Sequence, residues 1–303
     1  MGLRKPPKND AQIDMFMPVF GDISARDGID MMEFPFFSLS KKKRFTPLIY
    51  ANERRGIEII VSGAQPHGLA TIWDKDILIW AVSQVREALD RGEQPSKVIS
   101  FHPYYVLKSI RRGTSKKDYE RLEAAIIRLK NTNVHTTLRT DERTAKAGFS
   151  WIDNYTTAKE NVSGEAAGLW TISLNDWVYK AACNSSFILT LDDDYFLLTG
   201  GRERRLYLIA RKHGGYQKKG FIMPFKTLYK KMGAAEQFKY WARAVRKIVK
   251  ANQLPGYHLK VWRGKDELEY ISFTRRSSLS FDHPDYKPDY PKQTSKMLSG
   301  RYQ

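Results

Sequence analysis

The chain has 303 residues, a mass of 35.1 kDa and a formal net charge of +18 at pH 7. This length suits about two domains, and a hydrophobic share of 42% is ample for real cores. The single cysteine, Cys183, excludes an internal disulfide framework. We expect a cytoplasmic protein, because a single cysteine suits a reducing compartment. We expect no membrane partner, because the sequence lacks both a run of about 18 apolar residues and a signal-like N-terminus.

The positive charge is concentrated in one quarter of the chain. Between Arg202 and Arg276 there are 20 Lys and Arg residues against 5 Asp and Glu residues. Such a cationic region predicts a polyanionic partner, and double-stranded DNA is the most natural one. The alternative is an ordinary solvated surface.

The first half of the chain predicts a flexible arm, a hairpin, three helices and three strands. Pro6 and Pro7 discourage regular structure in the arm, residues 1–30. Ser115 and Asp118 predict a capping box at the start of the third helix. The hairpin is expected at 48–50 and 57–61, the helices at 73–91, 103–110 and 115–130, and the strands at 134–140, 149–157 and 169–174.

The second half predicts a similar succession of elements. Asp192 and its two acidic neighbours are expected to cap a short helix rather than to bind a metal. The polar faces of the helix at 202–213 are expected to leave Arg204, Arg205, Arg211 and Lys212 available to phosphates. The other expected elements are a linking helix at 175–184, a strand at 187–191, a short helix from 221, a long basic helix at 234–252 and a hairpin at 257–262 and 268–273.

Each half of the chain has helices followed by strands or a hairpin. This repeated order predicts an α+β chain of two tandem winged helix-turn-helix domains. The expected divisions are a flexible N-terminal arm (1–30), an N-terminal winged-helix domain (31–185), a C-terminal winged-helix DNA-binding domain (186–276) and an extended or disordered C-terminal tail (277–303). The N-terminal domain is the candidate for dimerisation, together with its hairpin.

The long basic helix is the main DNA-binding candidate. Phe238, Trp241 and Val245 form part of an apolar stripe at helical spacing, which leaves a cationic face on another side. Gln237 and Arg243 suit adenine and guanine edges, respectively. The candidates for phosphate contact are Lys239, Tyr240, Arg246, Lys247 and Lys250 on this helix, Lys226 and Lys230 on the helix before it, and Arg263 and Lys265 on the hairpin.

Two further surfaces are weaker candidates. Lys116, Lys117 and Arg121 on the helix at 115–130 suit either DNA backbone contact or a protein interface, because acidic residues share that face. Residues 12–16 resemble the short peptide with which bacterial replication proteins bind the sliding clamp, with Gln12, Asp14, Met15 and Phe16 as the binding residues. The alternative is that this segment packs on its own domain.

No catalytic constellation is evident in the sequence, so we expect neither an enzyme nor a bound cofactor or metal. No two of the six histidines lie within four residues of each other, which argues against a nickase with a local metal-binding pair. A nucleotide-binding loop of the P-loop type and a hydrolase nucleophile elbow are also absent.

Long collinear blocks resemble the plasmid replication initiator protein A family. They begin with Met31-Met32-Glu33-Phe34-Pro35-Phe36-Phe37 and LSKKKRFTPLIY, and continue with IEIIVSG, the block from Ile99 to Thr140, and LDDDYFLLTGGRERRLYLIARKHGG. The resemblance spans about residues 15–275. It implies tandem winged helices that bind directly repeated DNA sites (iterons) at a plasmid origin, without nuclease or ATPase activity.

The resemblance also implies a function. Initiators of this kind open an adjacent AT-rich segment as monomers, recruit host helicase and initiator proteins, and as dimers often repress their own gene. A monomer–dimer equilibrium is therefore expected. A transcriptional regulator with the same domains but no role in initiation is the alternative hypothesis, and an origin nickase is a third.

Overall fold

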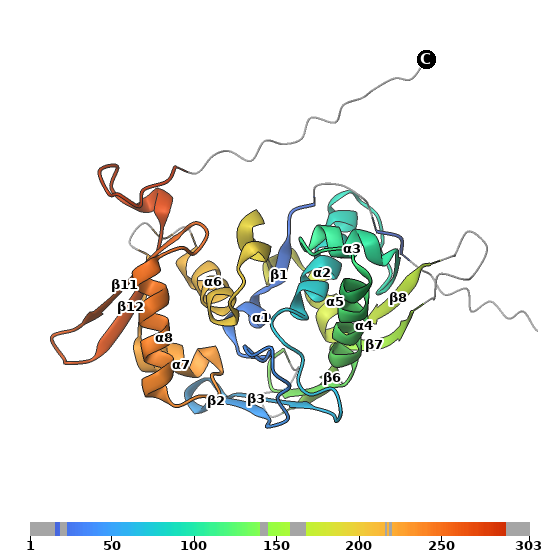
Figure 1. Ribbon diagram of the computed structural model, residues 1–303, viewed down its shortest axis with the longest axis horizontal. Coiled ribbons are helices and arrows are strands. Elements are labelled where there is room, and N and C mark those ends of the chain that lie inside the picture. The colour runs from blue at the N-terminus through green and yellow to red at the C-terminus, as the bar shows by residue number, and fades with distance from the viewer. Residues whose placement is uncertain are drawn as a thin grey trace, which may run out of the picture.

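The computed structural model describes residues 16–18, 23–139, 145–157, 168–215, 217 and 220–288. Two groups of helices and strands lie side by side, and β1 (Arg26–Gly28) and α1 (Ile29–Glu33) lie between them (Figure 1). The fold is mixed α/β, as expected.

The N-terminal half contains a helix, a strand, two helices and two strands that form one unit. Its three-stranded sheet has the order β4-β8-β7 and is antiparallel throughout. Ser115 and Asp118 form the predicted capping box at the start of α4. The elements are α2 (Lys75–Asp90), β4 (Val98–Phe101), α3 (Pro103–Ser109), α4 (Lys116–Lys130), β7 (Ile152–Thr156) and β8 (Trp170–Leu174), followed by α5 (Asp176–Cys183), which packs on α2.

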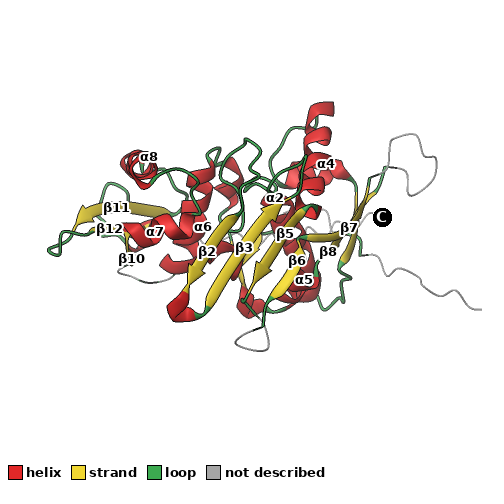
Figure 2. Ribbon diagram, turned by 90° about the horizontal axis from the view of Figure 1, so that it is seen from below, coloured by secondary structure: helices red, strands yellow, loops and turns green. Residues whose placement is uncertain are grey.

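A second sheet, with the order β2-β3-β5-β6, forms a layer of its own (Figure 2). Side chains alternate between its two faces, so Leu48, Ile59 and Val134 are buried while Ile49 and His135 are exposed. The strands are β2 (Leu48–Asn52), β3 (Ile57–Gly63), β5 (Thr132–Thr136) and β6 (Ala147–Ser150). The hairpin is as predicted, but the strand expected at 149–157 is two strands, β6 and β7, in different sheets.

The C-terminal half repeats the order of the first unit. Its sheet, β10-β12-β11, places the first strand beside the last, just as β4 lies beside β8. The elements are α6 (Gly201–Gly214), β10 (Phe221–Pro224), α7 (Phe225–Met232), α8 (Phe238–Ala251), β11 (Tyr257–Arg263) and β12 (Glu269–Arg275).

Two predicted helix boundaries in this half are wrong. The short helix expected from 221 begins at Phe225, because the preceding residues pair with β12 as β10 and Pro224 occupies the N-cap. The long basic helix begins at Phe238 rather than at 234. Gly233 takes the left-handed conformation that ends α7, with a φ of 61°, and the following residues form the turn.

The expected flexible arm is wrong for residues 23–30. Within this segment β1 (Arg26–Gly28) pairs with β9 (Ile188–Thr190), and α1 (Ile29–Glu33) packs on α6. Asp27 is fully buried and pairs with the equally buried Lys75. Because a buried charge needs a partner, this pairing fixes the segment to the body of the protein.

The expected tail is also partly ordered. Asp285 accepts hydrogen bonds from Asn252 Nδ2 (2.9 Å) and His258 Nδ1 (2.7 Å), and it forms an ion pair with Arg276 (3.1 Å). Residues 277–288 are therefore tied to the end of α8 and to β11. The rest of the predicted tail lies outside the described residues.

Candidate nucleic-acid interface

Helix α8 is amphipathic, with one face packed and the other exposed. Trp241 and Val245 are buried, and the Trp241 ring packs 4.9 Å from that of Phe225 on α7. Each buried side chain of this size stabilises the packing by about 1.5–3 kcal/mol. The opposite face exposes all the residues predicted for DNA contact on this helix, namely Gln237, Lys239, Tyr240, Arg243, Arg246, Lys247 and Lys250.

Gln237 stands at the N-cap of α8, and its side chain makes no capping hydrogen bond. Its amide is therefore exposed at the start of the helix, the end that inserts into a groove in helix-turn-helix proteins. Arg243 lies about two turns further along the same helix and is exposed. Lys239 Nζ lies 4.8 Å from the centre of the Tyr240 ring.

Arg246 differs from its neighbours because it already has a carboxylate partner. Its Nε and Nη2 atoms donate to the two carboxylate oxygens of Glu269 on β12, at 2.8 and 2.7 Å. This hydrogen bonding raises the pKa of Arg246. Arg246 is thus a restrained cation, and sequence spacing gave no sign of this contact between α8 and the hairpin.

The β11–β12 hairpin carries both signs of charge at its tip. Arg263 pairs with Glu267 at 3.2 Å, and Lys265 is exposed. Tyr270 donates its hydroxyl hydrogen to Asp266 at 2.6 Å, which lowers the pKa of this carboxyl group. On α7, Lys226 and Lys230 are exposed.

The start of α4 exposes Lys116, Lys117 and Arg121, as predicted. Arg121 forms an ion pair with Asp118 at 3.1 Å. Arg128 lies on the same helix but donates two hydrogen bonds of 2.7 Å to Asp74 at the start of α2. It braces α4 against α2 and is not part of the exposed cationic face.

The prediction that the α6 cations are available to phosphates is wrong for Arg204 and Arg205, whereas Arg211 and Lys212 are half-buried. Arg204 and Arg205 are 4% and 3% exposed, because α6 is buried on nearly all sides between the two halves. Arg204 Nη1 pairs with Asp76 at 2.6 Å, and Arg211 Nε donates to the Thr190 carbonyl at 2.7 Å. Lys212 lies 3.4 Å from Glu33. Part of the cationic excess therefore holds the two halves together.

Glu33 is the centre of this junction. Its carboxylate lies 2.9 Å from Lys231 Nζ and 2.8 Å from Arg55 Nη1. Burial alone would raise the pKa of Glu33, but the hydrogen bonds and charges of Lys231, Arg55 and Lys212 outweigh it and hold the pKa at about 2. Arg205 donates to the carbonyls of Met32 (2.8 Å), Glu33 (2.9 Å) and Lys231 (2.7 Å).

Phe16, the last residue of the clamp-binding candidate, is 8% exposed and packs on the N-terminal half. Its N–H donates to the Val98 carbonyl at 2.9 Å, and its carbonyl accepts from Ser100 at 3.0 Å. In this conformation Phe16 is not free for a partner. Gln12, Asp14 and Met15 lie outside the described residues.

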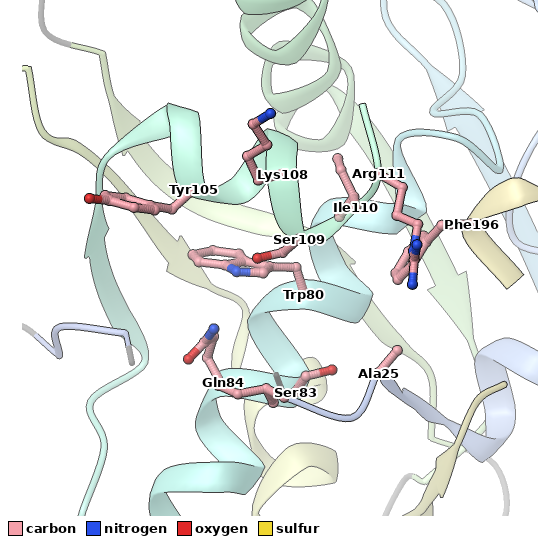
Figure 3. A pocket seen from close by; sticks show the side chains of 11 residues that line it. Ala25, Trp80, Ser83, Gln84, Tyr105, Lys108, Ser109, Ile110, Arg111 and Phe196 are labelled. Carbon is pink, nitrogen blue, oxygen red and sulfur yellow. The ribbon is translucent and has the colours of Figure 1, made fainter. Parts of the chain in front are cut away.

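Two places in the described residues bring polar side chains together outside the cationic faces. A cavity of about 440 Å³ lies between α2 and α3, with Trp80 and Ser109 on one wall and Ser83 and Gln84 on another (Figure 3). Among the described residues its lining has no carboxylate and no histidine, and its other titratable groups are Tyr105, Lys108 and Arg111. Separately, Asp192 caps the short helix Asp193–Leu197, in agreement with the prediction.

The second site is a cluster of His258, His283 and Asp285, whose potential ligand atoms lie within 4.8 Å of one another. The sequence gave no sign of it because the two histidines are far apart in the chain. His258 Nδ1 contacts the Asp285 carboxylate, and His283 Nδ1 accepts a hydrogen bond from the Asp285 backbone at 3.0 Å. These contacts hold residues 277–288 in place.

Comparison with known proteins identifies the family. Residues 26–259 match the model of the family described as "RPA: Replication initiator protein A". A relative from Wigglesworthia glossinidia brevipalpis, named "Putative replication protein", is 34% identical over 256 residues, which cover 84% of this chain and 90% of the relative. No helix within the described ranges is long and apolar enough to cross a membrane.

Among solved structures, domains 2 and 3 of RctB superpose on this chain with a TM-score of 0.60 at 12% identity. The match covers 82% of this chain and 97% of the RctB fragment. At that identity the likeness concerns the fold alone. The family match and the 34% identical relative decide the family, and the chain belongs to the replication initiator protein A family.

Proposed function

We propose that the protein is a sequence-specific double-stranded DNA-binding initiator of plasmid replication that binds repeats (iterons) at a plasmid origin. The observation that carries the proposal is the exposed face of α8. Gln237, Arg243, Lys247 and Lys250 are exposed there, while Trp241 and Val245 anchor the opposite face. A rigid helix with such a face suits a major groove, which is wide enough for an α-helix.

The proposed fold of each half is a winged helix. In the C-terminal half, α7 and α8 would be the helix-turn-helix and β11–β12 the wing, since the order of helices, strands and sheet pairing fits that motif. The N-terminal half would be a second copy that carries an insertion, β5 and β6, after its second helix-turn-helix helix, α4.

Within this arrangement, Gln237 and Arg243 would contact base edges, because amide and guanidinium groups match adenine and guanine edges. Lys239, Tyr240, Lys247 and Lys250 would contact phosphates and set the register. Arg263 and Lys265 would reach the backbone from the wing, and Lys226 and Lys230 from α7. Arg246 would contribute only when it leaves Glu269.

The N-terminal half would serve in self-association. Ile49 on β2 is 69% exposed at the edge of the four-stranded sheet, and an open edge strand with an exposed apolar side chain suits pairing with a second copy.

The N-terminal half would also make contacts with other partners. Lys116, Lys117 and Arg121 on α4 would contact the DNA backbone. Host helicase and initiator proteins are further proposed partners. The sliding clamp is also proposed to bind residues 12–16, which would require Phe16 to leave its buried place beside Val98 and Ser100.

Footprinting tests the DNA-binding proposal. On the cognate origin, the protein should protect directly repeated sites, and a protein with Arg243→Ala should lose the preference at one base position. Protection of no repeated site, at salt where random DNA is not bound, would contradict the proposal. A plasmid that carries only this gene and its upstream repeats then separates an initiator from a transcriptional regulator, since only an initiator lets it replicate.

We propose that the protein is not an enzyme and uses no metal or cofactor. An origin nickase is the competing class. Incubation of the protein with supercoiled origin DNA and a divalent metal would give a covalent protein–DNA adduct if that class were correct, and no adduct is expected.

A further inference from the structure

Residues 39–46, the basic loop, form an exposed cationic segment between the two halves. Lys41, Lys42 and Lys43 are all exposed, and among the described residues none of them forms an ion pair with a carboxylate. Three neighbouring cations without an acidic partner repel each other, so their placement favours an anionic ligand.

The basic loop is held at both ends by backbone hydrogen bonds. Ser38 donates to the Ala70 carbonyl at 2.9 Å, and Leu69 donates to the Arg44 carbonyl at 2.8 Å. Lys43 Nζ donates to the Pro66 carbonyl at 3.0 Å. The loop therefore presents its cations from a defined position, which lowers the entropic cost of binding.

One end of the basic loop contacts the turn that leads into α8. Arg44 Nη1 donates to the carbonyl of Gly233, the residue that ends α7, at 3.3 Å. Gly233 also lies close to the segment before the loop, because a Cβ on Gly233 would lie 2.6 Å from Pro35 Cβ. Arg44 thus acts as a positioning residue that sets the basic loop beside the start of α8.

The other end of the basic loop lies near the start of α4. Lys41 Nζ stands 5.1 Å from the centre of the Trp73 ring. The Trp73 carbonyl accepts a hydrogen bond from Arg112, which lies in the turn between α3 and α4. In Figure 1 this dark blue part of the chain runs between the orange helices α7 and α8 and the green helix α4.

We propose that Lys42 and Lys43 bind the phosphate backbone of the duplex between the places where α4 and α8 meet it. The inference rests on the proposed DNA-binding function and adds a third contact region to it. DNA is favoured over an acidic protein because the loop contacts the turn before α8 and, through Trp73, the turn before α4. Both helices expose lysines near their starts, Lys239 on α8 and Lys116 and Lys117 on α4. Lysines bind phosphates as point charges, so the loop adds affinity without base preference.

The test uses Lys42→Gln/Lys43→Gln in the full chain. Lys41 is kept because its ammonium group makes a cation–π contact with Trp73. Binding to a random-sequence duplex and to the origin fragment is measured across a salt series. Each lost phosphate contact should reduce the slope of log K against log salt by about 0.9. The slope should therefore fall by about 1.8, and affinity at 0.1 M salt should fall by up to roughly 60-fold. Base preference on the origin fragment should not change.

Two variants serve as controls. Lys146→Gln/Lys180→Gln removes the same charge from two exposed lysines before β6 and on α5, elements that lie away from the edge of the molecule occupied by α4 and α8 in Figure 2. It should leave the salt slope within about 0.3 of the wild-type value. Lys42→Arg/Lys43→Arg keeps the charge and should keep the slope. The urea midpoint of the Gln variant should match that of the wild type.

A Gln variant that binds both DNAs with the wild-type slope would overturn the loop proposal, and an acidic protein partner would then be the better reading of the lysines. A slope that falls equally in the control variant would also overturn it, because the effect would come from net charge alone. Failure of the wild-type chain to bind the origin fragment would instead refute the proposed function.

Discussion

Glu269→Gln is the most informative change at the proposed interface, because it should strengthen DNA binding. Glu269 holds Arg246 through two hydrogen bonds, and the two side chains are 24% and 50% exposed. An exposed ion pair of this kind is worth only about 0.2–1 kcal/mol. Its removal costs little stability, frees one cation on α8 and deletes a negative charge beside the duplex.

The expected size of the effect follows from counterion release. One additional phosphate contact steepens the slope of log K against log salt by about 0.9, which at 0.1 M salt corresponds to roughly 8-fold in affinity. That value is the upper limit, for a wild type in which Arg246 never leaves Glu269. Since the pair costs only about 0.2–1 kcal/mol to break, we expect a gain of about 1.5–5-fold on a random-sequence duplex.

The assay is a fluorescence-anisotropy titration at several salt concentrations. Glu93→Gln is a suitable control, because it removes one carboxylate that pairs with Arg91 at 3.3 Å, beyond the end of α2. The control should change neither slope nor affinity by more than the measurement error. An unchanged affinity for Glu269→Gln would mean that Arg246 does not face DNA, and the proposed docking of α8 would be wrong.

Four further predictions concern the interface and the junction. Arg243→Ala should cost about 1–3 kcal/mol of specific binding and relax preference at one base, which a set of single-base origin variants would reveal. Lys250→Ala should weaken binding to all sequences and lower the salt slope by about 0.9. Arg205→Met should leave three buried carbonyls without this donor and lower the free energy of unfolding, measured in urea, by about 3–5 kcal/mol. The control Arg202→Gln breaks an exposed pair with Glu236 and should cost less than about 1 kcal/mol. Because the pKa of Glu33 is lowered to about 2 from 4.5, its stabilisation is present above pH 4.5 and is lost as the pH falls toward 2, so Glu33→Gln should flatten the urea stability curve in that window.

Local patterns in the sequence predicted most of the elements and the exposed face of α8. The apolar stripe of that helix and the capping box of α4 depend on residues within a few positions of one another, and such periodicity can be read directly. The twofold succession of helices and a hairpin could be predicted for the same reason.

Contacts between distant segments could not be predicted. Arg204 and Arg205 follow the pattern of exposed helix residues, yet they are buried, because α1 packs on α6 and Asp76 of α2 pairs with Arg204. A charged residue on a helix is normally exposed. Arg204 and Arg205 can be buried because Asp76 and backbone carbonyls, respectively, pair with them, and the sequence does not show these partners. The position of Arg246 beside Glu269 depends likewise on how the hairpin lies against α8.

The junction also constrains how the protein could be divided. A break at residue 186 would separate Arg205 and Lys231 from their partners in α1, so the C-terminal half alone would expose or leave unpaired several charges that are buried in the whole chain. We expect that fragment to be much less stable than its hydrophobic core suggests.

The distance along the chain between Arg205 and α1 has a consequence for the newly made protein. Arg205 lies 172 and 173 residues after the two carbonyls that it holds, those of Glu33 and Met32. At about 5–20 residues per second, roughly 10–35 s pass on the ribosome between the synthesis of α1 and that of its partner helix. During that interval β1 and α1 have no strand β9 and no helix α6 to pack on. The packing of β1 and α1 on the C-terminal half is therefore among the last contacts to form. The protein can hold α4 and α8, the two helices proposed to face DNA, in one arrangement only when its synthesis is nearly complete.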